Sequence, residues 1–144
     1  MVSTTRGRRD RLRRVNGVFL GLRTVIYPAP DLGTSKAWFS GLLGVEPYFD
    51  EPFYVGFNVA GYELALDPSG DPATGPITYW GVAAADAALD RLLGAGATLR
   101  EGVQEVGGGI RVATVLEPGG TILGIIENPH FQLPEPPAGA GPGR

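Results

Sequence analysis

Apolar and polar positions along residues 20–130 form a regular succession of strand and helix patterns. The run from Leu20 to Tyr27 is β-like and ends at Pro28 and Pro30, which cannot continue a central strand. The next segment, 31–44, predicts a helix because its large apolar residues recur at helical spacing: Trp38, Phe39, Leu42 and Leu43. Thr34 or Ser35 is expected to cap its start, and Gly44 fits the left-handed position beyond its end.

Two further β-like runs, 52–61 and 62–67, are joined through Ala60 and Gly61 and are followed by a turn-rich linker over 67–76. In the first run aromatic residues alternate with small and polar ones. We expect Phe53, Val55 and Phe57 to line the core, because successive strand residues point to opposite faces. Tyr54 and Asn58 then share the other face.

The same order of patterns returns in the second half of the chain. A strand over 77–82 and a helix over 86–94 precede three further strands, expected at 97–106, 110–116 and 121–127. The halves match when Thr24–Gly44 is set against Thr78–Gly96, and GYELAL from Gly61 against GTILGI from Gly120. This repetition predicts an α+β fold in which a βαβββ unit is used twice.

Length, charge and composition predict one folded domain between two flexible terminal segments. For 144 residues we expect a single domain at 17–131, with modules at about 17–70 and 76–131. Residues 1–16 hold six arginines and one aspartate, which predicts a disordered arm; an alternative function for it is nucleic-acid association. Residues 132–144 are rich in Pro and Gly and predict a flexible tail. No stretch resembles a secretory signal or a membrane span, so a cytoplasmic protein is expected.

The inventory of reactive side chains removes several classes of site. The chain has no Cys, which excludes disulfides, zinc–thiolate sites and thiol nucleophiles. It has one histidine, His130, placed after the last predicted strand. A site that needs two or three imidazoles cannot be built from one chain.

The ordered pieces resemble the vicinal oxygen chelate superfamily, the glyoxalase/bleomycin-resistance/dioxygenase family. The resemblance rests on Asp31-Leu32, the helix with Trp38-Phe39 and Leu42-Leu43-Gly44, the AALDRLLGAGA helix and Glu117-Pro118-Gly119-Gly120. It implies two βαβββ modules that form a cupped mixed sheet with helices on the outer face. It also implies a homodimer.

The resemblance implies a metal in the cup of many members, held by His and Glu side chains on four strands. The corresponding positions in this sequence are Thr24, Ala65, Thr78 and Gly124. None of them is a good ligand for a transition metal, because such sites need imidazole and carboxylate donors. We therefore expect no metal and no cofactor. If the register is shifted by one residue, the only added candidate ligands are Glu63 and Glu127, which would form a carboxylate-only metal site.

Candidate ligand-binding residues follow from strand alternation. If Thr24 and Thr78 face the cup, then Ile26 and Trp80 do so too. Trp80 then either stacks on a planar ligand or fills the cup as core. Tyr54 and Asn58 present polar groups to the cup, and Arg111 either lies at the rim or binds an anionic group.

These observations favour a metal-free protein that binds a small organic molecule in the cup, similar to the bleomycin-resistance type. The alternative is an enzyme of the same superfamily, a lyase, isomerase or dioxygenase, in which Glu63 or Glu127 performs acid/base work or holds a metal. Substitution of both glutamates distinguishes the two classes, because it should abolish turnover if the protein is such an enzyme. The sequence does not identify the ligand.

Overall fold

The computed structural model of the protein describes residues 17–133. The arginine-rich arm at 1–16 and residues 134–144 of the predicted tail lie outside the described residues. The first module contains β1 (Gly21–Pro28), α2 (Leu32–Leu43), β2 (Phe49–Glu51), β3 (Tyr54–Val59) and β4 (Tyr62–Asp67). The second contains β5 (Ile77–Gly81), α3 (Ala85–Gly94), β6 (Thr98–Glu105), β7 (Arg111–Leu116) and β8 (Ile122–Glu127).

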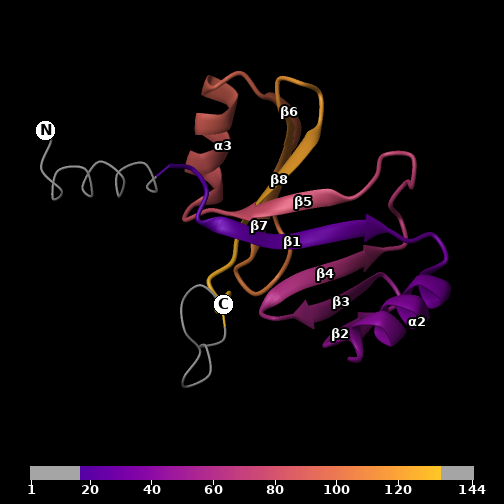
Figure 1. Cartoon of the computed structure of the whole chain (residues 1–144). Helices are drawn as coiled ribbons and strands as arrows, with labels where there is room; N and C mark the ends of the chain where they lie inside the picture. Colours follow the sequence, from indigo (N-terminus) through magenta and orange to yellow (C-terminus); the bar gives the residue numbers. More distant parts are fainter. Residues whose placement is uncertain (1–16, 134–144) are drawn as a thin grey trace, which may run out of the picture.

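The eight strands form one mixed sheet in the order β2-β3-β4-β1-β5-β8-β7-β6. Each module keeps its strands on its own side, and the two modules meet where β1 and β5 pair antiparallel (Figure 1). Within each module the first strand pairs parallel to the last, β1 with β4 and β5 with β8. The predicted α+β fold with two βαβββ modules is confirmed; the short edge strand β2 was not predicted as a separate element.

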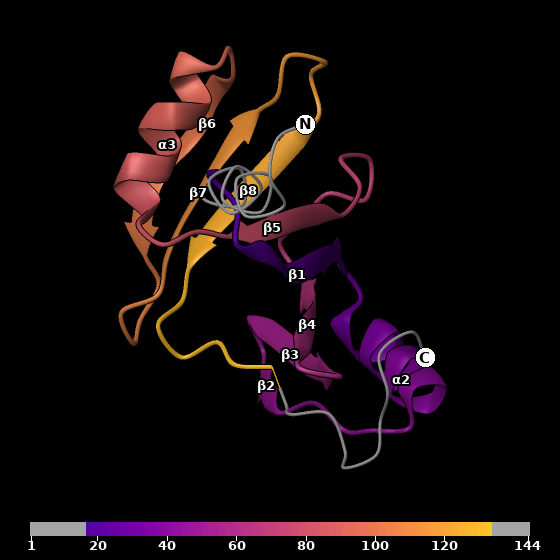
Figure 2. The ribbon, with the colours of Figure 1, turned by 60° about the vertical axis from the view of Figure 1, so that its left-hand side comes forward.

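Strand register and the two core clusters place both helices on the same side of the curved sheet, which we call the helix face. Figure 2 shows α2 beside the strands of the first module and α3 beside those of the second. On the first module Val55, Phe57 and Leu66 are fully buried against α2. On the second module Val82, Ala113 and Ile125 form the corresponding cluster beneath α3. We call the opposite side, which neither helix covers, the inner face.

Strand β3 shows how alternation selects the core. Val55 and Phe57 are buried, as expected, whereas the expectation for Phe53 is wrong because it lies in the turn before β3 and is 66% exposed. The strand then turns through Ala60 and Gly61, both with positive φ, which is the type I′ geometry of a two-residue hairpin.

The helix ends follow local chemistry. Gly44 adopts the left-handed conformation at the end of α2, as predicted. The start of α2 is capped by Asp31 rather than by Thr34 or Ser35: the Asp31 carboxylate accepts the backbone N–H of Thr34 at 3.2 Å. Among residues 17–133, no helix has the length and apolar character that a membrane crossing requires.

Candidate functional site

A row of opposed residues crosses the inner face of the sheet. Strand pairing sets Glu63 opposite Thr24, Thr24 opposite Tyr79, and Tyr79 opposite Gly124. The row continues to Thr114 on β7 and Glu101 on β6. Because directly opposed residues share a face, the row brings polar side chains of both modules to the side of the sheet without helices.

Three hydroxyl groups converge on the carboxylate of Glu63. Thr24 donates to Glu63 Oε1 at 3.1 Å, and Tyr54 donates to the same oxygen at 2.9 Å. Tyr48 donates to the other oxygen, Oε2. We call these four residues the Glu63 cluster. A carboxylate offers about four lone-pair positions, so roughly one position on Oε2 is left for another donor.

Gly56 provides the space in which this cluster forms. A Cβ atom at position 56 would lie 2.6 Å from Glu63 Oε2 and 3.1 Å from the Tyr48 ring. A side chain there would therefore push the carboxylate and the tyrosine apart. The glycine belongs to β3 and stands opposite Ala65, which is another small inner-face residue.

Burial and the neighbouring carboxylate keep the two tyrosines protonated. Desolvation raises the pKa of Tyr54 far above its ordinary value, and the charge of Glu63 raises it further. The pKa of Tyr48, a more exposed residue, is raised by partial desolvation of its hydroxyl and then by its hydrogen bond to Glu63. Both hydroxyls are therefore donors throughout the physiological pH range, and they fix the orientation of Glu63.

The second module contributes a different set of groups to the same face. The Tyr79 ring lies over Gly124, where a Cβ would come within 2.5 Å of a ring carbon. Arg100 on β6 donates to the Thr114 hydroxyl at 3.2 Å and pairs with Glu101 at 3.3 Å. Burial raises the pKa of Tyr79, and the charge of Glu101 adds to the effect.

A second cation of the inner face is covered by the end of the described chain. Arg23 lies at a bulge in β1, and its side chain passes over Gly81, where a Cβ would come 2.5 Å from Nε. Its guanidinium lies 3.9 Å from the centre of the Phe131 ring. Burial lowers the pKa of Arg23.

Of the expected ligand-binding residues, the structure brings Thr24 and Tyr54 together in the Glu63 cluster. Asn58 stands opposite Glu63, but its side-chain oxygen accepts the backbone N–H of Gly61 at 2.9 Å. The side-chain oxygen of Asn58 is thus committed to the hairpin turn.

The expectation that Thr78 and Trp80 face the inner side is wrong. Thr78 pairs with Val25 on the helix face, whereas Tyr79 stands opposite Thr24. The Trp80 ring stacks against Phe19 on the helix face, with ring centres 5.1 Å apart, so it neither fills the cup nor meets a ligand there. Because side chains alternate with period two, the one-residue slip in matching the two modules placed both residues on the wrong face.

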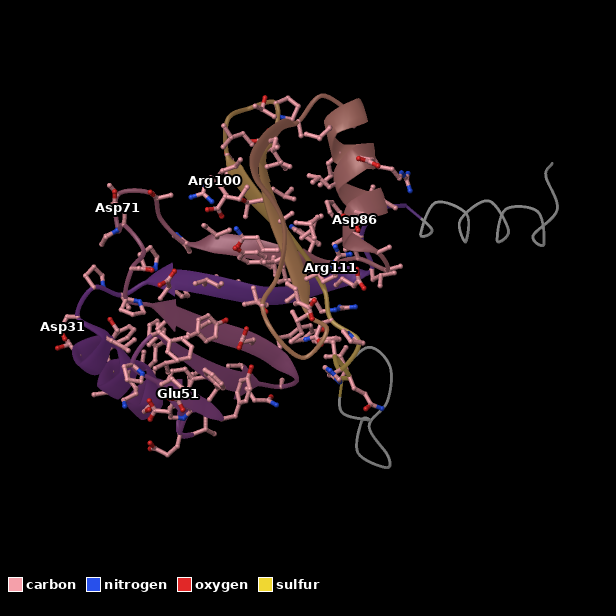
Figure 3. The ribbon with its side chains drawn as sticks, turned by 180° about the vertical axis from the view of Figure 1, so that it is seen from behind. Asp31, Glu51, Asp71, Asp86, Arg100 and Arg111 are labelled. Carbon is pink, nitrogen blue, oxygen red and sulfur yellow. The ribbon has the colours of Figure 1, made fainter. Side chains whose placement is uncertain are left out.

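Arg111 and Glu127 also lie on the helix face, where they hold the start of α3. Arg111 donates to Asp86 at 2.7 Å, and Figure 3 shows the two residues side by side between β7 and α3. Glu127 accepts the backbone N–H of Ala85 at 2.8 Å and lies 4.0 Å from Arg111. Arg111 therefore lies outside the cup, paired with Asp86, rather than inside it beside an anionic ligand. The two candidate glutamates are separated: Glu63 is on the inner face and Glu127 caps a helix.

The inner-face residues do not fit a transition-metal site. Of the four positions that the resemblance indicates, Thr24, Ala65 and Gly124 lie on the inner face, and only the first has a side-chain donor. Over residues 17–133 no three side chains of His, Cys, Asp or Glu come together in a group that could hold a metal ion. His130 lies elsewhere, with Nε2 2.7 Å from the Gly108 carbonyl oxygen.

Sequence reasoning missed Tyr48, Gly56 and Arg100. Tyr48 precedes β2, in a loop that the apolar pattern did not resolve, and it reaches Glu63 only through the folded β2–β3 hairpin. The signal that was available is the glycine in the middle of an otherwise bulky strand, because such a residue often marks a close approach by another group.

Comparison with solved structures shows which proteins share this fold. A variant of methylmalonyl-CoA epimerase from Streptomyces coelicolor in complex with 2-nitronate-propionyl-CoA superposes with a TM-score of 0.62 at 16% identity, over 82% of this chain and 100% of that one. A glyoxalase/bleomycin resistance protein/dioxygenase superfamily member from Vibrio splendidus 12B01 gives 0.58 at 19% identity, over 74% and 99%. The Mn(II)-bound glyoxalase from Novosphingobium aromaticivorans gives 0.60 at 17% identity, over 76% of this chain and 39% of the longer glyoxalase.

These likenesses establish that the chain has the vicinal oxygen chelate fold. A scan against models of protein families gives no match. A search among curated proteins gives none either.

Proposed function

We propose that this chain binds a small organic molecule on the inner face of its sheet, at the Glu63 cluster, without a transition metal. The observation that carries the proposal is the convergence of Thr24, Tyr48 and Tyr54 on one half-buried carboxylate. Three donors hold Glu63 in one orientation before any ligand arrives. Such fixed polar groups beside aromatic surface are typical of small-molecule sites.

The donor set argues for an organic ligand rather than a metal. The row across the central strands offers one carboxylate, two hydroxyls and a glycine: Glu63, Thr24, Tyr79 and Gly124. Protonated tyrosine and threonine hydroxyls are poor ligands for Mn²⁺, Fe²⁺, Ni²⁺ or Zn²⁺. The same groups are good partners for the hydroxyl, amide or ammonium groups of an organic molecule.

A second candidate function is catalysis by Glu63, and the enzymes that share the fold favour it. Methylmalonyl-CoA epimerase is among them. In such a reaction Glu63 would accept a proton from the substrate at Oε2, the oxygen with a free position. Three hydroxyl donors already occupy most of the acceptor positions of the carboxylate, so we rank binding ahead of catalysis.

The experiment is native mass spectrometry of untagged protein taken directly from cells, combined with elemental analysis. The proposal predicts an organic adduct that is lost in Glu63→Gln and kept in Asp90→Asn, which makes the same charge change on the exposed side of α3. One equivalent of manganese, iron, nickel or zinc per chain would contradict it. Turnover of methylmalonyl-CoA that disappears in Glu63→Gln would favour the enzyme.

The expected homodimer is a separate proposal. The superfamily resemblance implies it, and sedimentation velocity on the full chain would measure it. A monomer at all concentrations tested would contradict it without affecting the proposed ligand site.

A further inference from the structure

We infer that the ligand of the Glu63 cluster is a small organic cation, of the alkylammonium class, held between this carboxylate and a neighbouring patch of aromatic rings. The inference deepens the proposed function and rests on it. Two independent observations carry it: Glu63 lacks a counter-charge because the cations described near it have other partners, and aromatic rings lie beside it.

Glu63 has no ion-pair partner among residues 17–133. The salt bridges among residues 17–133 involve other carboxylates: Asp50, Asp86, Glu101 and Glu127. Glu63 is instead surrounded by three neutral hydroxyls, and it is only partly exposed. A carboxylate withdrawn from water is stabilised most by a positive charge, which a ligand can provide.

Four aromatic residues form a patch around this carboxylate, and we call them the aromatic patch: Tyr48, Phe49, Phe53 and Tyr54. Phe49 meets both Phe53 and Tyr54 edge to face, with ring centres 6.0 Å apart in each pair. Phe49 stands opposite Gly56 and therefore lies on the inner face. Tyr48 and Phe53 are 62% and 66% exposed, so the patch is open to solvent.

The faces of aromatic rings attract cations, and recognition of alkylammonium groups commonly combines several rings. Here two of the rings belong to tyrosines whose hydroxyls point at Glu63. A cation that contacts the patch is thus brought close to the carboxylate. A neutral apolar ligand would gain only the contact with the rings.

Within residues 17–133, the two arginines of the inner face and the lysine of α2 have other partners. Arg23 stacks on Phe131, and Arg100 pairs with Glu101 and Thr114. Lys36 pairs with Asp50 at 3.1 Å, and Asp50 stands opposite Val55 on the helix face. None of these side chains is placed to neutralise Glu63.

The test is a ¹H–¹⁵N chemical-shift titration of the full chain with choline and, in parallel, with 3,3-dimethyl-1-butanol, an uncharged molecule of the same shape. We expect choline to give saturable shifts at residues 48–56 and at Glu63. The neutral molecule should bind at least about ten-fold more weakly, because it lacks the charge that pairs with the carboxylate. Asp90→Asn should bind choline like the parent protein.

Two variants separate the contributions of the carboxylate and of the aromatic rings to choline binding. Glu63→Gln should weaken choline binding about ten-fold or more. Phe49→Leu keeps an apolar side chain and leaves Glu63 unchanged, so it supplies a test even if Glu63→Gln does not fold; loss of the ring face should weaken choline binding about three-fold. Equal binding of choline and the neutral alcohol would overturn the inference, as would shifts confined to other parts of the sheet.

The outcome separates the inference from the proposed function. An uncharged or anionic organic adduct that is lost in Glu63→Gln would keep the proposed site and overturn the cation. A dimer that buries Tyr48 and Phe53 and abolishes the choline shifts would also overturn it. Sedimentation velocity under the titration conditions identifies that case.

Discussion

The Tyr54 hydroxyl donates to Glu63 Oε1 at 2.9 Å, which joins the start of β3 to the inner face of β4. Thr24 on β1 donates to the same oxygen. A single carboxylate thereby ties together three neighbouring strands of the first module. The tie is polar, half-buried and placed on the side of the sheet that neither helix covers, and the proposals and the following predictions depend on it.

The first prediction concerns stability at high pH. The pKa of Tyr54 is raised in the folded protein, whereas an unfolded tyrosine loses its proton near pH 10. Above about pH 10 the unfolded chain therefore binds fewer protons than the folded chain, and stability falls as pH rises. Urea unfolding between pH 8 and pH 11 should show this loss, which amounts to about 1.4 kcal/mol by pH 11 for each such tyrosine.

Tyr54→Phe provides the control for that measurement. It removes one proton from the linkage, so its stability should fall less steeply above pH 10 by about the contribution of one tyrosine. Equal slopes in the two proteins would mean that Tyr54 ionises normally in the folded state.

The second prediction concerns the space at Gly56. Gly56→Ala should lower the free energy of unfolding by about 1–3 kcal/mol, because the new methyl group overlaps Glu63 Oε2 and the Tyr48 ring. The matched control is Gly102→Ala on β6, where a Cβ meets no atom within 4 Å. That variant should be neutral or slightly stabilised, by up to about 1 kcal/mol. Similar values for the two variants in urea unfolding would contradict the geometry.

The third prediction separates two phenylalanines of one segment. Phe57 is fully buried, and Phe57→Ala should cost about 3–5 kcal/mol. Phe53 is largely exposed, and Phe53→Ala should cost less than about 1 kcal/mol. A large loss of stability in the Phe53 variant would mean that Phe53 is part of the core, as the sequence pattern had predicted.

These two residues also show what the sequence can predict. Alternation identified Val55 and Phe57 as core because both lie inside a regular strand. It failed for Phe53 because alternation has no meaning in a turn. It failed for Thr78 and Trp80 because the match between the modules was displaced by one residue, which inverts every side chain of a strand.

The site was predictable in part for the same reason. Thr24, Tyr54 and Glu63 lie on regular strands, and all three were singled out from the sequence. Tyr48 was not, because its contact with Glu63 depends on how the β2–β3 hairpin folds over Gly56. Glu127 was a candidate base by residue type alone; only the packing of α3 against β8 reveals it as a cap.

The fourth prediction tests that division between the two glutamates. Glu127→Ala removes the acceptor for the Ala85 N–H and should cost about 1 kcal/mol of stability. It should leave the occupancy of the organic adduct unchanged in native mass spectra, because Glu127 lies on the helix face. Glu63→Gln, by contrast, should remove the adduct from the native mass spectra. If the Glu127 variant lost the adduct at unchanged stability, the ligand site would lie on the helix face and not at the Glu63 cluster.

The central claim is that Glu63 and its three hydroxyl partners hold an organic ligand and not a metal. A crystal structure of untagged protein, purified from cells without added ligand, tests it most directly. The account predicts density for an organic molecule in contact with Glu63 Oε2 and the Tyr48 ring. A metal ion coordinated by this chain's own residues at that position, or an organic molecule bound on the helix face instead, would contradict it.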